Sequence, residues 1–561
     1  MDGIYIIDDK LNIDIQKLTY PKIEYSKKRE ASDFHEYVIN LFKIYPTIQK
    51  LIIPINLGEM DGEKLDGLIL GLHIRLNNEI GDKKLIPLIF IGEEDLEELL
   101  LLTKNNLNNP VYLLATKGCI YCNILSTLDD FVKYETGVEV YEKDVLNHLK
   151  LIQPTEDGGK HSLANIWGAI RLNEVLNLNA IDKSLSKRTK ELYFKYLRAF
   201  HEESKGSFKD LQPLQCTGKR ILLIDDEADK GWNDVLKAIF KGSDFQSIDF
   251  KNKTYDVAEQ EAISKSISEK WDLILLDLRL NPSEEDIGDK TIKTEDYSGA
   301  KILKAIKKHN SGIQVIILTA SNKAWNMKKL LDLGADGYYI KESPEFNFSP
   351  AFTNESYKNF KEEVRKCFES IDLKEIFEIH KKCHNFLKID KPNRSNSYKL
   401  FYERSEASLE IAFELLKKSA DDKKYLNLAY LTYFQILEDY VGQHMNFKFN
   451  YGTGNAYVDS NVLVIDGDTK EWQLKFIKKG IDKFDYFEIG TETNDKNWSS
   501  LSQISFVLVF KFSKDNVYLQ KWGKLNYLRN TKAGHGGNGG FVEIEEIKEL
   551  LEIVELFLTK Q

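Results

Sequence analysis

Short apolar runs alternate with polar stretches of helix length through the middle of the chain. Four such runs end in polar residues: KRILLIDDEAD (219–229), WDLILLDLRL (271–280), IQVIILTAS (313–321) and ADGYYIKESP (335–344). Apolar runs this short are typical of parallel strands that are buried on both faces. The pattern therefore predicts a doubly wound α/β domain over residues 216–348.

The polar residues at the ends of these runs carry candidate chemistry. The first run leads into Asp225 and Asp226, the second carries Asp277, and the last two reach Thr319 and Lys341. Ligands of open parallel sheets bind at the carboxyl ends of the strands, so we expect these side chains to converge. Three carboxylates suit Mg²⁺, which prefers oxygen ligands. The hydroxyl and the ammonium facing them are suited to hold a phosphoryl group on Asp277.

Residues 218–345 resemble the receiver domain of two-component response regulators at these positions. The resemblance implies that Asp277 is the phosphoacceptor and that Asp225 and Asp226 hold Mg²⁺ together with it. It also implies that a sensor histidine kinase or a phosphorelay protein is the partner.

The same resemblance implies a switch. Thr319 and Lys341 are its switch pair, and Tyr338 is the aromatic residue that changes rotamer. The interval from Asp277 to Thr319 is longer than the family norm, because NPSEEDIGDKTIKTED adds an acidic surface insertion. The alternative is a doubly wound domain whose acidic residues are only solvated strand ends.

A weaker copy of the pattern opens the chain, over residues 1–125. GIYIIDDK parallels ILLIDDEA, KLIIPINLG parallels LILLDLRLN, PLIFIGEE parallels VIILTASN, and VYLLATKG supplies Lys117 as the lysine of the set. Pro54 stands in the position of Asp277. Because proline has no carboxylate, we interpret this copy as a pseudo-receiver that serves contacts and accepts no phosphoryl group.

The segment between the two copies, residues 126–215, has helical periodicity. Its apolar residues share one face of a helix: Leu163, Ile166, Ile170, Leu172 and Val175. This predicts a helical hairpin that links the domains and dimerises. His161 and Asn165 have the H-x-x-x-N spacing that resembles the phosphoacceptor box of histidine-kinase dimerisation helices, which implies phosphotransfer at His161. Ser162 replaces the acidic residue of that box, so the alternative is that His161 is an incidental surface residue.

Residues 349–561 are predicted to form an all-α domain. Helical periodicity covers YERSEASLEIAFELLKKSADD, KKYLNLAYLTYFQILEDYVGQHM and FVEIEEIKELLEIVELFLTK, and we interpret residues 446–515, with short β-like runs, as an insertion. Near the end, LRNTKAGHGGNGG contains Arg529, Asn530 and His535 before a glycine run. A helix end with a basic residue and a glycine stop would account for part of this segment, but not for the R-N-x4-H spacing.

That spacing resembles HEPN domains, helical units of many prokaryotic RNases and toxins, over residues 400–561. The resemblance implies a metal-independent endoribonuclease, in which the RNA 2′-OH attacks the adjacent phosphate, and a homodimer in which two motifs face each other. His535 is suited to move protons, Arg529 to hold a phosphate and Asn530 to orient the RNA. The upstream helix carries two acidic residues that are candidates to orient the arginine: Glu438 and Asp439.

Composition narrows the classes of function. At 561 residues the chain is long enough for three or four domains, and its net charge of −10 argues against broad binding to nucleic acid, so any RNA contact is local. No signal peptide pattern and no apolar run of about 18 residues is present. Five scattered cysteines do not make a disulfide framework, and the lone pair Cys119 and Cys122 favours packing thiols over zinc. We therefore expect a cytoplasmic protein without membrane contact.

Together these parts predict a multi-domain α/β plus all-α protein with two flavodoxin-like doubly wound receiver-type domains. The expected function is that of a phosphorylation-regulated endoribonuclease, by analogy an effector of stress response or phage defence. The alternative is a non-catalytic phosphorelay scaffold. A DNA-binding response regulator ranks third, because neither a helix-turn-helix nor a basic face follows the receiver-like segment.

Overall fold

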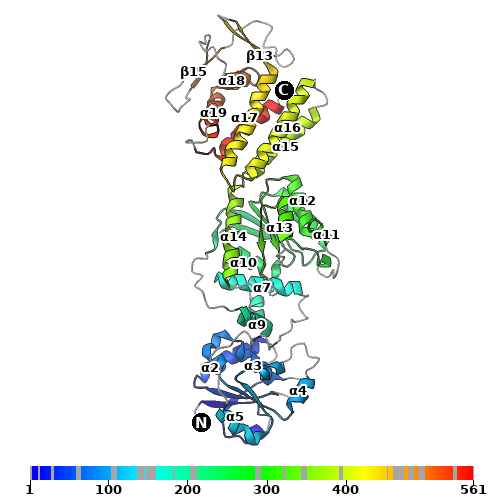
Figure 1. The fold of residues 1–561 in the computed structure, drawn as a ribbon, viewed down its shortest axis with the longest axis vertical. Helices are drawn as coiled ribbons and strands as arrows, with labels where there is room; N and C mark the ends of the chain where they lie inside the picture. The colour runs from blue at the N-terminus through cyan, green and yellow to red at the C-terminus, as the bar shows by residue number, and fades with distance from the viewer. Residues whose placement is uncertain are drawn as a thin grey trace.

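The computed structural model is elongated, with two α/β bodies and one helical body in a row (Figure 1). The described residues are all those outside the following segments: 1–2, 11–12, 27–30, 58–64, 103–109, 135–145, 147–148, 150–159, 181–182, 202–211, 285–291, 320–323, 343–349, 391–395, 451–452, 459–472, 478–485, 491–499, 535–539 and 560–561. No helix among the described residues is long and apolar enough to cross a membrane.

The first α/β body is a parallel sheet with strand order β2-β1-β3-β4-β5. Its strands are β1 (Ile4–Asp8), β2 (Lys22–Glu24), β3 (Lys50–Pro54), β4 (Leu88–Ile91) and β5 (Cys119–Cys122). Its α-helices are α1 (Ile13–Gln16), α2 (Ala31–Ile44), α3 (Asp66–Arg75), α4 (Leu96–Leu102) and α5 (Leu128–Tyr134). Apolar clusters cover both faces of the sheet, which explains why its strands are apolar without alternation.

The second α/β body repeats this strand order as β9-β7-β10-β11-β12. Its strands are β7 (Arg220–Ile224), β9 (Asp244–Ser247), β10 (Leu273–Asp277), β11 (Val315–Thr319) and β12 (Gly337–Ile340), and a two-stranded ladder of β6 (Leu214–Gln215) and β8 (Phe240–Lys241) lies beside them. The helices are α10 (Trp232–Ile239), α11 (Tyr255–Ser268), α12 (Ser298–His309), α13 (Ala324–Asp332) and α14 (Pro350–Glu369).

A glycine at the same place in both bodies supports the internal duplication. The helix after the third strand begins against the backbone of that strand. A Cβ on Gly67 would lie 1.8 Å from the carbonyl oxygen of Pro54, and one on Gly299 would lie 2.1 Å from the carbonyl oxygen of Asp277. Only glycine allows this close approach, so the first copy has kept the packing requirement of the fold.

The last strand of the first body differs from the sequence expectation. The apolar run VYLLAT forms 3₁₀ turns (Pro110–Ala115), and the strand β5 follows it. Lys117 therefore precedes β5, whereas Lys341 directly follows β12, and the two lysines are not equivalent. Cys119 and Cys122 lie on β5 itself as buried free thiols, and they pack into the clusters on opposite faces of the sheet.

The linker helices pack onto the α/β bodies instead of standing apart as a hairpin. They are α7 (Lys160–Val175), α8 (Lys183–Arg188) and α9 (Leu192–His201). Helix α7 lies across the ends of α10 and α14 (Figure 1), and its residues Leu163, Ile166 and Ile170 join the core of the second body. Helix α9 contributes side chains to the cores of both α/β bodies. The apolar face expected to dimerise is thus covered within one chain.

The second α/β body extends beyond its predicted end at residue 348, because helix α14 belongs to it. Its apolar residues Tyr357, Phe360 and Val364 are buried against the second sheet, so this body extends through Glu369.

The helical body consists of α15 (Leu373–Asp390), α16 (Asn396–Lys417), α17 (Lys424–His444), α18 (Ser500–Phe510), α19 (Asn516–Leu528) and α20 (Ile544–Thr559). Two hairpins interrupt it, β13 (Met445–Asn450) with β14 (Thr453–Val458) and β15 (Gln473–Ile477) with β16 (Tyr486–Gly490). The insertion is shorter than the expected 446–515, because Ile504, Val507 and Leu508 of α18 lie in the helical core.

Candidate functional site

Three carboxylates and one ammonium converge at the carboxyl edge of the second sheet. Asp225 and Asp226 follow β7, Asp277 ends β10, and Lys341 follows β12. One carboxylate oxygen from each aspartate lies within 4.8 Å of the others. The Nζ of Lys341 lies 2.8 Å from Oδ2 of Asp225 and 3.0 Å from Oδ1 of Asp277. The structure therefore brings together four of the residues that the sequence pattern selected.

The charges in this pocket are strongly coupled. Burial opposes the charged form of Lys341, but the carboxylates of Asp225 and Asp277 raise the pKa of its ammonium above the ordinary value. Burial, together with the carboxylates of Asp277 and Asp225, raises the pKa of Asp226 to about 9. One ammonium thus does not compensate the three carboxylates.

The donor set fits a magnesium ion. Oδ1 of Asp226 is buried and has no hydrogen-bond partner in the described part of the chain. The three aspartates offer only oxygen ligands, which is the donor type that Mg²⁺ selects. Asp225, Asp226 and Asp277 would hold the ion.

The two remaining switch candidates lie on the neighbouring strands β11 (Val315–Thr319) and β12 (Gly337–Ile340). Thr319 ends β11 and is buried, and its carbonyl oxygen accepts a hydrogen bond of 2.7 Å from the backbone N–H of Lys341. Tyr338 on β12 is 39% exposed, whereas the next residue, Tyr339, is buried.

Helix α7 covers this pocket, which the sequence did not indicate. Nδ2 of Asn165 donates a hydrogen bond of 2.6 Å to Oε2 of Glu227, and its Oδ1 accepts one of 3.1 Å from Nζ of Lys341. The indole of Trp232 lies beside the same ammonium, 5.2 Å from Nζ to the ring centroid. The sequence indicates Asn165 only through its spacing from His161, whereas its position here depends on packing between segments far apart in the chain.

His161 belongs to the first turn of α7, and its side chain lies outside the described residues. The expected phosphotransfer at this histidine therefore remains a prediction.

The matching edge of the first body is acidic but not equipped for the same chemistry. Oδ1 of Asp8 accepts hydrogen bonds from the N–H of Lys10 at 2.8 Å and from Gln16 at 2.7 Å. Asp225 makes the corresponding turn contact with the N–H of Glu227. Pro54 occupies the end of the third strand, and the first body contributes no metal-ligand cluster among the described residues.

A second candidate site lies at the end of α19 in the helical body. The chain forms a π-helical turn at Arg529–Ala533, and such turns are frequent at functional sites. The guanidinium of Arg529 lies 3.2 Å from Oε1 of Glu438 and donates a hydrogen bond of 2.9 Å to Oδ1 of Asn530. It also lies over the ring of Phe434, 5.4 Å from the centroid.

The acidic residue that contacts Arg529 is Glu438. Asp439 accepts instead from Gln435, at 2.9 Å. His535 lies outside the described residues, so the distance from Arg529 to this histidine is not defined.

Comparison with known proteins identifies the first body. Residues 4–122 match the family model described as "Inactive Receiver domain". Among solved structures, the chain is similar to a response regulator receiver domain protein (CheY-like) from Methanospirillum hungatei JF-1. The identity is 20%, the match covers 27% of this chain and 95% of that chain, and the TM-score is 0.18. No curated protein matches the chain. The family match over residues 4–122 confirms the prediction of a receiver-like first domain without a phosphoacceptor.

Proposed function

We propose that the chain is a phosphorylation-responsive signalling protein whose second α/β body is a receiver domain. The observation that carries this proposal is the convergence of Asp225, Asp226, Asp277 and Lys341 at one edge of the sheet. The partner is a sensor histidine kinase or a phosphorelay protein.

The proposed reaction is phosphoryl transfer to Asp277. A carboxylate oxygen of Asp277 attacks the phosphorus of the donor, an O–P bond forms, and the donor's bond to phosphorus breaks with its electron pair leaving on the donor. Bound Mg²⁺ would neutralise charge on the phosphoryl oxygens. The ammonium of Lys341 lies close enough to contact the same oxygens, and Thr319 supplies a hydroxyl at the neighbouring strand end.

Phosphorylation also has a route to the rest of the chain. A phosphoryl group on Asp277 competes with Asn165 for Lys341, so the contact that holds α7 over the pocket weakens. The linker continues from α7 to α9, which packs on the inactive receiver domain. The first domain then serves as the body on which this movement acts.

The proposed output is the helical body, acting as a HEPN-like, metal-independent endoribonuclease in a homodimer. Arg529 would hold the scissile phosphate, Asn530 would orient the RNA, and His535 would move protons. Support comes from the pair of Arg529 with Glu438, which fixes a guanidinium that remains 39% exposed.

A non-catalytic phosphorelay scaffold is the second candidate. The observation that favours it is the inactive receiver domain, because a receiver fold without an acceptor functions only through its contacts.

The acceptor is tested by incubating the purified chain with acetyl phosphate and Mg²⁺ and measuring its intact mass. We expect one added phosphate, and none in Asp277→Ala. Labelling that survives this substitution would show that another residue is the acceptor.

The output is tested separately, by RNA cleavage in EDTA. Attack by the 2′-OH predicts 2′,3′-cyclic phosphate ends and no cleavage of 2′-O-methyl RNA. Absence of cleavage with and without the phosphodonor would favour the scaffold.

A further inference from the structure

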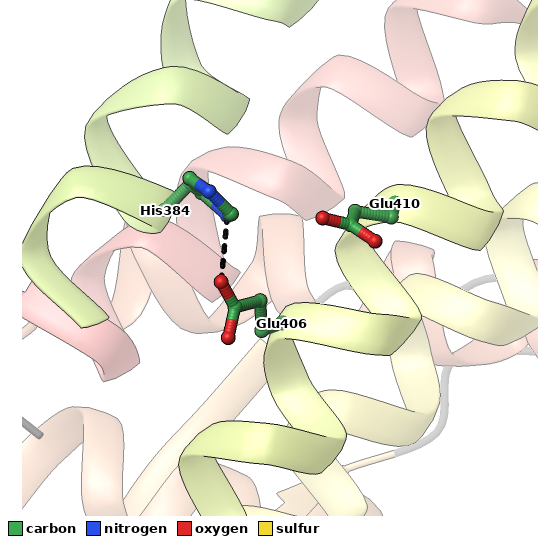
Figure 2. Close-up of side chains that lie close together, drawn as sticks. All are labelled: His384, Glu406 and Glu410. Atoms are coloured by element: carbon green, nitrogen blue, oxygen red, sulfur yellow. Dashed lines mark ion pairs between the residues drawn. The ribbon is translucent and has the colours of Figure 1, made fainter. Parts of the chain in front are cut away.

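Three potential metal ligands, none of which belongs to either site described above, face one another across two helices of the helical body. Figure 2 shows His384 on α15 and Glu406 and Glu410 on α16, all directed into the space between the helices. One ligand atom from each residue lies within 4.8 Å of the other two. Nδ1 of His384 lies 3.4 Å from Oε1 of Glu406.

The polar groups of this cluster are poorly compensated by the protein. Nδ1 of His384 is buried and makes no hydrogen bond among the described residues, and its contact with Oε1 of Glu406 is an ion pair only if the imidazole is protonated. In the described part of the chain, neither Glu406 nor Glu410 has an ion pair with a lysine or an arginine. Like charges at i and i+4 of a helix repel, and a buried ring nitrogen without a partner is unfavourable. A cation between the three side chains would relieve both costs.

We propose that His384, Glu406 and Glu410 bind a divalent first-row transition metal ion of the zinc class. Nδ1 of His384 and one oxygen of each glutamate are its protein ligands, and water takes the remaining position.

The donor types and the spacing favour this class of ion. Tetrahedral bonds of about 2.0–2.2 Å place neighbouring ligand atoms about 3.3–3.6 Å apart. The separation of 3.4 Å between Nδ1 of His384 and Oε1 of Glu406 is already within this range, and the exposed Glu410 needs only a change of rotamer. Imidazole nitrogen is a ligand for zinc and its neighbours, whereas Mg²⁺ and Ca²⁺ prefer oxygen alone.

The ion would join α15 to α16. Both helices contribute to the core of the helical body, as do α17, which carries Glu438, and α19, which leads into Arg529. The metal therefore acts as a cross-link that stabilises this body, independently of whether the body cleaves RNA. Because a metal that binds only the folded state shifts the unfolding equilibrium, its effect is visible in thermal unfolding.

The experiment uses the full chain carrying Asp226→Asn and Asp277→Asn, which removes the other metal-ligand cluster. After treatment with EDTA and removal of the chelator, Zn²⁺ is titrated by calorimetry, and Co²⁺ is used as a spectroscopic probe. We expect the site to be lost in His384→Ala and zinc to bind at least about tenfold more weakly in Glu410→Gln. Glu410 is exposed, so its substitution leaves folding intact.

The matched control is Glu414→Gln, one turn further along α16. Glu414 is 62% exposed and pairs with Lys417, so its substitution should leave zinc affinity unchanged. Zinc should also raise the unfolding temperature of the parent but not of Glu410→Gln. Unchanged zinc affinity in both His384→Ala and Glu410→Gln, or no zinc binding by the parent, would overturn the proposal.

Discussion

The two α/β bodies share a fold and differ in the residues that support chemistry. Both have five parallel strands in the same order, a glycine pressed against the third strand, and an aspartate at the end of the first strand that accepts a turn hydrogen bond. Only the second has an aspartate at the end of the third strand and a lysine directly after the fifth. The contrast teaches that packing constraints outlast the loss of the acceptor.

The two edges also differ in how their charges are satisfied. Asp8 is held by a neutral amide from Gln16, a local contact within one body. Asp225 and Asp277 are held by the buried ammonium of Lys341, and removing one member of such a set leaves uncompensated charge. The second edge therefore depends on one ammonium to balance its buried carboxylates, whereas the first does not.

The largest expected effect is the difference in labelling between the bodies. In a chain carrying Asp277→Ala, adding Pro54→Asp should restore no phosphorylation, because no lysine follows β5. Intact mass after acetyl phosphate measures this. Restored labelling would mean that an aspartate alone converts the inactive receiver domain.

The next effect concerns RNA cleavage by the helical body, which is the proposed output of phosphorylation in the second body. His535→Ala or Arg529→Ala should lower RNA cleavage about 10²–10⁴-fold, since each removes a group that acts on the phosphate or its protons. Glu438→Gln should also lower cleavage, whereas Asp439→Asn should not, because Asp439 contacts Gln435. Equal effects of the two acidic substitutions in a gel assay would contradict the orienting role of Glu438.

Removing the ammonium of Lys341 should destabilise the second body more than a comparable substitution destabilises the first. Lys341→Met leaves buried carboxylates facing each other and should cost about 3–5 kcal/mol of unfolding free energy. Gln16→Leu in the first body removes the amide hydrogen bond to Asp8 and the exposed one that Lys22 donates to the same side chain, and should cost about 1–2 kcal/mol. Urea unfolding with and without Mg²⁺ compares them, and Mg²⁺ should reduce only the first loss. Similar losses would show that the pocket charges are not coupled as described.

Weakening the cover over the pocket should speed phosphorylation. Asn165→Ala removes the side chain that bonds Lys341 and Glu227, and we expect labelling of Asp277 about tenfold faster, the equivalent of one charged hydrogen bond. Asn173→Ala on the same helix is the control, because among the described residues the hydrogen bond given for the Asn173 side chain is the one from the backbone N–H of Ala180. A slower rate in Asn165→Ala would assign this asparagine a supporting role in the reaction.

The smallest expected effect is on the junction between the bodies. Nζ of Lys195 on α9 lies 3.1 Å from Nδ1 of His73 in the first body, and both groups are buried. Burial lowers the pKa of Lys195 to about 7 and that of His73 well below its ordinary value. Above pH 7 the unfolded lysine holds a proton that the folded one has lost, and below about pH 6.5 the unfolded histidine gains one. Stability should therefore be greater at pH 8 than at pH 6, by on the order of 1 kcal/mol.

Hydrogen exchange of α9 at the two pH values measures this junction. Other charged groups near the pair, including His35, Glu79, Lys190 and Arg198, remain in the variant Lys195→Met. That substitution should reduce the difference between pH 6 and pH 8. If the stability difference between pH 6 and pH 8 is unchanged in Lys195→Met, it arises from the neighbouring histidines and not from Lys195.

The sequence by itself determined the two parallel sheets and the acidic edge of the second. Strands buried on both faces leave continuous apolar runs, and parallel strands bring their carboxyl ends to one edge, so Asp225, Asp277 and Lys341 were predictable neighbours. Pro54 likewise indicated a first copy without an acceptor, as the family match confirms. These inferences depend on the local hydrophobic pattern and on the rule that the carboxyl ends of parallel strands lie at one edge of the sheet.

Only the tertiary structure decided which segments lie over these edges. VYLLAT is as apolar as a strand but forms 3₁₀ turns, and the apolar α18 resembles neighbouring β-like runs although it is a core helix. Asn165 reaches Lys341 across 176 positions of the chain, because the apolar face of α7 packs on the second sheet instead of on another α7. His384 and Glu406 likewise meet only because α15 and α16 pack against each other. Periodicity shows that a helix has an apolar face, but the surface that covers this face depends on how all the elements pack together.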